Sequence, residues 1–142
     1  MEKIIWQTDN CKMYIRFRND YVDNFFPRPC ASFIIGVELK KSSWIGGELT
    51  YRAEDGFNMT GSGLLSELGR LVNSYSEKEF RIQDAEADTD GYILFDCKPD
   101  CVKVSGQLGA TFCGDVVSKF KFTANASILY NLYDALKEKT IY

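Results

Sequence analysis

CKMYIRFR, residues 11–18, alternates strictly between apolar and polar side chains. Cys11, Met13, Ile15 and Phe17 occupy one parity, and a tyrosine with three basic residues occupies the other. Successive side chains of a strand point to opposite faces of its sheet, so the pattern predicts a strand with one face on a core and one in water. Half-buried strands of this kind are typical of antiparallel sheets.

Two more strands are expected directly after this segment, at 32–40 and 44–53. A short turn at Lys40–Lys41–Ser42 would join them into a hairpin. The second strand is expected to bury Ile45, Leu49 and Tyr51 at alternate positions. The following stretch, 53–63, is rich in turn residues and precedes the first predicted helix.

Two helices are predicted, near 62–75 and 125–139, because leucines and other apolar residues recur there at helical spacing. Ser62 and Asn125 are the candidate N-caps. Short strands are expected between the helices, near 78–85, 91–98, 101–113 and 116–123. The predicted fold class is therefore α+β, mainly antiparallel β-sheet with about eight strands, arranged as two similar halves that each end in a helix.

The length and composition favour one domain with a binding function. A chain of 142 residues suits a single core. It contains no histidine, the residue on which most triad, zinc and proton-shuttle chemistry depends, so an enzyme is not expected. The net charge of −3 disfavours direct nucleic-acid binding and favours a basic partner.

The cysteines and the N-terminus predict a cytoplasmic location without membrane contact. Neither a signal peptide nor an apolar run long enough to span a membrane is present, and the number of cysteines, five, is odd. Free thiols are therefore expected. The spacing of Cys97 and Cys101 lacks the further ligands of a metal site and predicts a hairpin turn, so no metal or cofactor is expected.

The most unusual stretch is acidic and contains Asp84, Glu86, Asp88 and Asp90. These carboxylates share one parity and would project from one face of an extended chain. A calcium loop of the EF-hand type is disfavoured, because Cys97 stands where a bidentate glutamate is needed. Two interpretations remain open, a docking surface for a basic partner and an ordinary solvated turn.

A second candidate contact segment lies at 18–29 and carries Tyr21, Phe25 and Phe26 among charged residues. Aromatic and arginine side chains are the types that anchor protein interfaces. The alternative is that Phe25 and Phe26 fold back onto the core.

Taken together, several segments resemble a known family over essentially the whole chain, residues 1–142. They are the Trp44–Leu49 motif, the leucine-rich helix from Leu64 to Tyr75, the acidic stretch at 84–90, and Phe120–Phe122 before the closing helix. The chain resembles the immunity proteins of the wall-associated toxin systems, the WapI type. The resemblance implies a single immunity-protein domain that binds and neutralises the C-terminal toxin domain, a transfer-RNA nuclease, of its cognate toxin.

The resemblance transfers no contact residues, so the candidate sites remain those read from the residues themselves. A second interpretation also stays open, a small-ligand-binding or scaffold domain without a toxin partner.

Overall fold

The computed structural model describes residues 2–22, 31–42, 46–59, 63–83, 91–109 and 118–139. The first half contains β1 (Glu2–Gln7), β2 (Cys11–Val22), β3 (Ala31–Ser42), β4 (Glu48–Met59) and α1 (Gly63–Asn73). The second half contains β5 (Glu79–Gln83), β6 (Tyr92–Cys97), β7 (Val102–Leu108), β8 (Ser118–Ala124) and α3 (Ser127–Lys139).

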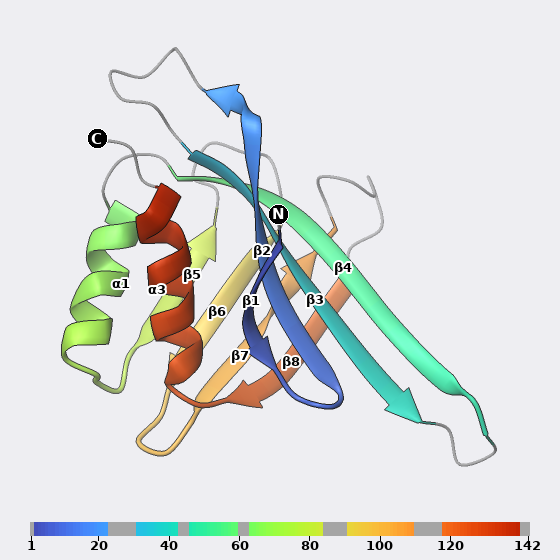
Figure 1. Ribbon diagram of the computed structural model, residues 1–142. Coiled ribbons are helices and arrows are strands. Elements are labelled where there is room, and N and C mark those ends of the chain that lie inside the picture. The colour runs from blue at the N-terminus through green and yellow to red at the C-terminus, as the bar shows by residue number, and fades with distance from the viewer. Residues whose placement is uncertain are drawn as a thin grey trace.

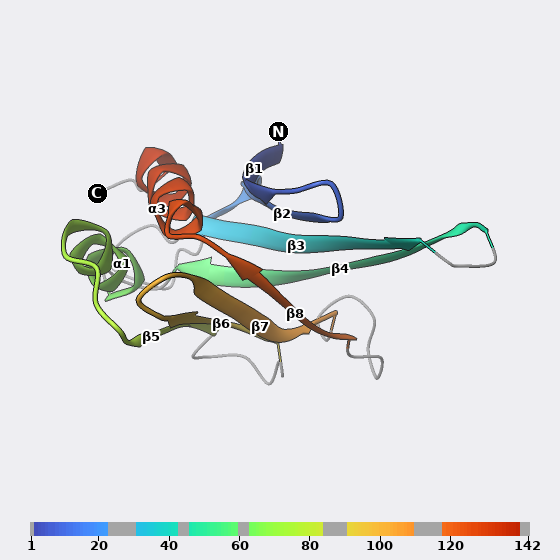
Figure 2. The ribbon, with the colours of Figure 1, turned by 90° about the horizontal axis from the view of Figure 1, so that it is seen from below.

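Each half forms its own antiparallel sheet. The first sheet has the order β1-β2-β3-β4 and the second has the order β5-β6-β7-β8, so each strand pairs with its sequence neighbour. The sheets lie one above the other, and both helices sit at one end (Figures 1 and 2). The predicted fold class, α+β with two antiparallel halves that each precede a helix, is confirmed.

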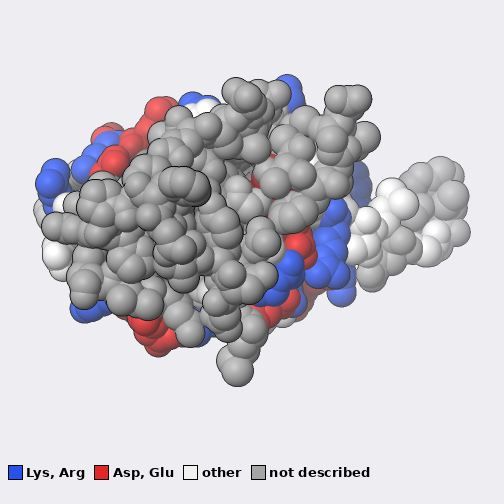
Figure 3. Space-filling view, turned by 90° about the horizontal axis from the view of Figure 1, so that it is seen from above, with Lys and Arg blue, Asp and Glu red and all other residues white. Residues whose placement is uncertain are grey.

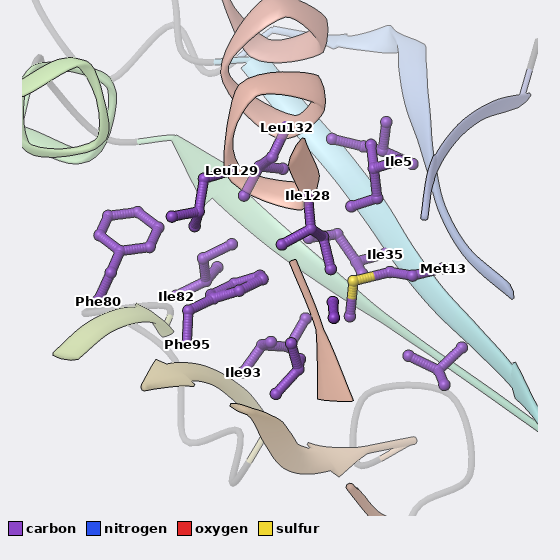
Figure 4. Close-up of a cluster of buried hydrophobic side chains, with 14 of the residues drawn as sticks. Ile5, Met13, Ile35, Phe80, Ile82, Ile93, Phe95, Ile128, Leu129 and Leu132 are labelled. Carbon is purple, nitrogen blue, oxygen red and sulfur yellow. The ribbon is translucent and has the colours of Figure 1, made fainter. Parts of the chain in front are cut away.

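One hydrophobic core joins the two sheets. Met13 and Ile15 of β2 are fully buried, as the alternation at 11–18 predicts. Across the core, the second sheet contributes Phe80, Ile82, Ile93 and Phe95. Figure 4 shows Ile128, Leu129 and Leu132 of α3 pointing between the buried side chains of the two sheets. The closing helix therefore completes the core at the end where the sheets alone would leave it open.

The helix α3 also covers the free edge of β1. Asn125 caps the helix, because its side-chain oxygen accepts hydrogen bonds from the backbone and the hydroxyl of Ser127. The β1–β2 register shifts between Ile4 and Trp6, which is a β-bulge. The side chain of Asn131 donates to the carbonyl oxygen of Ile5 in this bulge, at 3.0 Å. A carbonyl that the bulge removes from the ladder thus gains a partner from the helix.

The hairpin of β3 and β4 is longer than the sequence predicts. The predicted turn at Lys40–Lys41–Ser42 is wrong, because these residues pair with β4 as far as Ser42 opposite Glu48. Positive φ values of 94° and 95° at Gly46 and Gly47 place left-handed backbone further along, before β4 begins. Glycine tolerates this conformation without strain, which is why the chain reverses here.

The second strand of the hairpin also differs from its prediction. Leu49 is not buried but 68% exposed, and Tyr51 is half-buried. Ile45 lies outside the described residues. The stretch from 53 to 59, predicted as turn-rich, continues β4 in unbroken register with β3. Aspartate and glycine keep the backbone N–H and C=O groups that a ladder needs, so a composition that resembles a turn does not prevent pairing here.

The predicted turn between Cys97 and Cys101 is confirmed. The backbone N–H of Lys98 donates to the carbonyl of Cys101 at 2.8 Å, and the hydroxyl of Tyr75 donates to the carbonyls of both residues. The described cysteines, Cys11, Cys97 and Cys101, are free thiols, and Cys30 and Cys113 lie outside the described residues. Neither described helix is long and apolar enough to cross a bilayer.

We expect the Asn131 hydrogen bond to stabilise the closed arrangement of α3 on β1. Replacing Asn131 with Asp keeps the shape but removes the donor, so the free energy of unfolding should fall by about 1–2 kcal/mol in urea titrations. Asn131→Ala should cost a similar amount, whereas the neighbouring exposed Tyr130→Ala serves as the control. Unchanged stability in Asn131→Asp would show that the bulge carbonyl is equally well satisfied by water.

Candidate binding surface

The sequence-predicted contact residues lie mostly outside the described part of the chain. Asp84, Glu86, Asp88 and Asp90 fall in the segment between β5 and β6, and Phe25 and Phe26 fall between β2 and β3. Tyr21 lies in β2, but only its backbone is described. Their predicted roles therefore stay predictions.

A different group of side chains forms an ordered site on the outer face of the first sheet. We name it the Tyr14 cluster, and it consists of Glu2, Lys12, Tyr14, Arg16, Arg52 and Glu54. The even positions of β2 and β4 point away from the core, and Gly36 of β3 stands between Tyr14 and Glu54 in the ladder. The alternation that buries Met13 and Ile15 therefore also places this cluster.

Tyr14 is fully buried although it lies on the outer face. Its ring lies across Gly36, where an added Cβ would come within 2.1 Å of the ring atom Cζ. The glycine leaves room for the ring to lie on the sheet. Lys12 and Arg52 approach the ring, with the Lys12 amine at 5.3 Å and the Arg52 guanidinium carbon at 5.7 Å from its centroid. Both separations are within the range of cation–π attraction.

The carboxylate of Glu54 is the centre of the hydrogen-bond network. Arg16 binds it through two parallel bonds, at 3.1 Å from Nη1 and 2.8 Å from Nη2. Arg52 donates to Glu54 at 3.1 Å and to the Tyr14 hydroxyl oxygen at 3.2 Å. The Tyr14 hydroxyl in turn donates to Glu54. Two arginines and a tyrosine thus fix one carboxylate, and charge-assisted bonds of this kind are among the strongest in proteins.

A second ion pair lies over the same region. The amine of Lys12 is 2.7 Å from the carboxylate of Glu2 in β1. The cluster therefore contains three cations and two carboxylates, spread over three strands. Next to it, Ile4 of β1 pairs with Tyr14 and is 47% exposed. An exposed apolar side chain beside a rigid charged network is a combination that suits protein recognition.

The pKa values show that the network holds its protonation states firmly. Hydrogen bonds from Arg16, assisted by those from Tyr14 and Arg52, lower the pKa of Glu54 to about 2 against the opposing effect of burial. Burial, with the hydrogen bond to Glu54, raises the pKa of Tyr14 to about 12. Neither group changes its protonation near neutral pH, so this site offers fixed charge and not proton transfer.

Burial makes two of the described thiols, Cys11 and Cys97, unreactive. Burial raises the pKa of Cys11 to about 11 and raises that of Cys97 as well. A thiol is a nucleophile or metal ligand only as its thiolate, so burial suppresses both roles. Within the described ranges, no three cysteine, aspartate or glutamate residues gather closely enough to hold a metal ion.

Sequence reasoning missed the Tyr14 cluster for a physical reason. The polar half of CKMYIRFR carries the signal, a tyrosine between a lysine and an arginine, but a polar strand face is by default solvated. The partners Arg52 and Glu54 are about 40 positions away, and Glu54 lies in the stretch that composition assigns to a turn. Only the β2-β3-β4 register brings these residues together.

The described side chains on the outer face of the second sheet form a smaller network of contacts than the Tyr14 cluster. The guanidinium of Arg81 stacks on the ring of Tyr92, with its carbon 4.2 Å from the ring centroid. Lys119 and Lys121 of β8 are exposed on this face. These two lysines lie in the other sheet from the Tyr14 cluster and make a useful reference for charge changes.

Comparison of the chain with known proteins finds no matching family model, no matching curated protein and no matching solved structure.

Replacing Gly36 with Ala should disrupt the cluster. The added methyl group must displace the Tyr14 ring, and overpacking of this kind typically costs about 1–3 kcal/mol of stability. In a Tyr14→Ala background the same change should cost much less, because the obstacle is gone. A double-mutant cycle in urea measures this coupling, and additive effects of the two changes would contradict the described packing.

Glu54 should make folding stability depend on acid. A carboxylate whose pKa is lowered in the folded state stabilises the fold above its unfolded pKa, and this stabilisation is lost as the pH falls toward the folded value. The free energy of unfolding should therefore decline between about pH 4.5 and pH 2, and Glu54→Gln should flatten the decline. Glu67→Gln, which changes an exposed carboxylate, is the control. If the free energy of unfolding depends on pH in the same way in both variants, Glu54 does not cause the decline.

Proposed function

We propose that this chain is a cytoplasmic immunity protein that binds and neutralises the C-terminal nuclease domain of a cognate wall-associated, contact-dependent toxin. It acts by stoichiometric binding and not by catalysis. The resemblance over the whole chain is the starting point of this proposal. A nuclease that attacks transfer RNA acts in the cytoplasm, so its inhibitor must be present there.

The Tyr14 cluster is the observation that supports a binding function best. Its six side chains are held by mutual hydrogen bonds and ion pairs before any partner arrives. Binding then costs little side-chain entropy, which is the main advantage of a preorganised surface. Its arginines, Arg16 and Arg52, stay partly exposed, and arginine is a residue type that dominates binding energy at interfaces. The buried Tyr14 helps to hold Arg52 and Glu54 in place. The fixed protonation states of the cluster fit recognition better than acid–base chemistry.

The charge balance supports the choice of partner. A nuclease must present cations to the phosphates of its RNA, and this chain carries a net charge of −3. In the proposal, the acidic segment with Asp84, Glu86, Asp88 and Asp90 attracts the basic domain and speeds association. The aromatic residues Tyr21, Phe25 and Phe26 supply contact area.

The alternative, a small-ligand-binding domain, has less support in the described residues. A hollow beside the β1–β2 turn, lined by residues 7–12 with Glu38 and Lys40, has a volume of about 70 Å³. Typical ligand pockets hold about 300–1,000 Å³, so this hollow is several times too small.

The direct test is binding to the toxin domain encoded immediately upstream of the gene for this chain. Co-expression should restore survival of cells that produce the nuclease domain, and the purified proteins should form a stable complex that no longer cleaves transfer RNA. Survival without a complex would point to another mechanism. If the cells do not survive and no complex forms, the proposed function is wrong.

The acidic segment should affect the rate of binding more than the fold. Changing Asp84, Asp88 and Asp90 to Asn and Glu86 to Gln should slow association with the nuclease domain at low salt and flatten its salt dependence. The urea midpoint of the free protein should stay the same or rise slightly. Stopped-flow association measures the effect, and an unchanged rate at low salt would leave the segment as ordinary solvated surface.

A further inference from the structure

The end of the β3–β4 hairpin leaves the body of the protein as a two-stranded ribbon. The β2–β3 ladder ends where Cys11 pairs with Leu39, and a single further backbone bond joins Lys40 to Asn10. Beyond that point, β3 pairs only with β4. We name the described residues 40–42 and 46–50 the β3–β4 arm. Figures 1 and 2 show the arm projecting past the other strands, at the end away from the helices.

The arm exposes apolar surface in open solvent. Leu49 is 68% exposed, more than the other large apolar side chains that are exposed in the described ranges. Gly46 and Gly47 near the tip have no atom within 4 Å of an added Cβ. A two-stranded ribbon without a core on either face is marginally stable in water. A partner that packs on the arm would both cover Leu49 and stabilise the ribbon.

The charged residues of the arm limit which surface of a partner the arm can bind. Lys40 and Lys41 are exposed at the root of the arm, and Arg52 follows on β4 with 57% of its side chain exposed. In Figure 3 the arm is the protrusion at the right, and both basic and acidic side chains lie where it leaves the body. Among the described residues of the arm, two lysines, Lys40 and Lys41, stand against one acid, Glu48, so the arm has a net charge of +1 in a chain that is acidic overall.

We propose that the arm docks on the nuclease domain at an exosite, with Leu49 in an apolar pocket bordered by carboxylates. This inference rests on the proposed function. The phosphate-binding surface of a nuclease is itself cationic, so Lys40 and Lys41 would be repelled there. An apolar pocket with an acidic rim outside that surface complements both Leu49 and the two lysines. The acidic segment and the arm then bind two different regions of the nuclease domain.

The experiment compares three variants in stopped-flow and equilibrium binding to the upstream-encoded nuclease domain. Leu49→Ser should weaken the equilibrium affinity about tenfold or more, because it removes an apolar anchor. The double variant Lys40→Glu with Lys41→Glu should slow association about tenfold at low salt. All three replaced side chains are exposed, so far-ultraviolet circular dichroism and the urea midpoint should match the wild type.

The double variant Lys119→Glu with Lys121→Glu is the matched control. It changes the net charge by the same amount on the exposed face of β8. A more acidic chain is attracted more strongly to a basic domain, so the control should accelerate association while the arm variant slows it. Acceleration by both double variants would mean that the arm contacts the cationic surface of the nuclease domain or does not contact that domain at all. Either result would exclude the exosite.

Two further outcomes would contradict the docking of the arm at an exosite but leave the proposed function intact. Wild-type affinity in Leu49→Ser and in the arm double variant would show that the arm is solvated in the complex. A wild-type dimer that Leu49→Ser converts to monomer in analytical ultracentrifugation would assign the arm to a second copy of this chain. By contrast, the absence of any complex between wild-type protein and nuclease domain would remove the proposed function itself.

Discussion

The structure depends on the strict two-sidedness of β2. This strand pairs with β1 on one side and β3 on the other, so its register fixes three strands at once. Met13 and Ile15 enter the core, while Tyr14 and Arg16 face outward. A slip of one residue would exchange the two sets and place an arginine in the core, at a cost that no surface contact could offset. The same alternation therefore creates both the hydrophobic interior and the only surface network among the described residues that gathers three cations and two carboxylates.

The two edges of the first sheet are managed in different ways. The β1 edge is covered by α3 through Asn131 and the Lys3–Glu138 ion pair. The β4 edge runs for 12 residues without a bulge, an arrangement that invites pairing with another chain. Asp55 offers a physical explanation of how this is avoided. It points inward from β4, is fully buried beside Gly91, and has one carboxylate oxygen without a partner among the described residues. Inward-pointing charged residues are among the features by which natural edge strands resist pairing with another chain.

Local patterns predicted the parts of the fold that local physics decides. The alternation at 11–18 and the leucine spacing of both helices are properties of neighbouring residues, and so is the cap at Asn125. The end of the β3–β4 hairpin was mispredicted because lysines and serine resemble a turn while the glycines that allow the reversal stand further on. The Tyr14 cluster depends on pairing between distant segments, which no local pattern encodes. For the predicted contact residues, Asp84 to Asp90 with Phe25 and Phe26, sequence remains the sole guide.

Within the proposed function, the Tyr14 cluster and the arm form one continuous recognition surface. Arg52 belongs to the cluster and pairs with Glu38, two positions from the pair of Lys40 and Thr50 in the arm. Covering the cluster costs less than covering isolated charges, because Glu54 and Glu2 already have cationic partners and their hydrogen bonds survive in the interface. Glu38 of β3 stands opposite both Lys12 and Arg52 in the ladder, so this outer face carries three carboxylates, Glu2, Glu38 and Glu54, beside its three cations. A partner that buries this region therefore covers a charge-balanced face, in which Arg52 is the most exposed of the three cations. A preference for an acidic contribution from the partner therefore comes from Lys40 and Lys41 of the arm and not from the cluster.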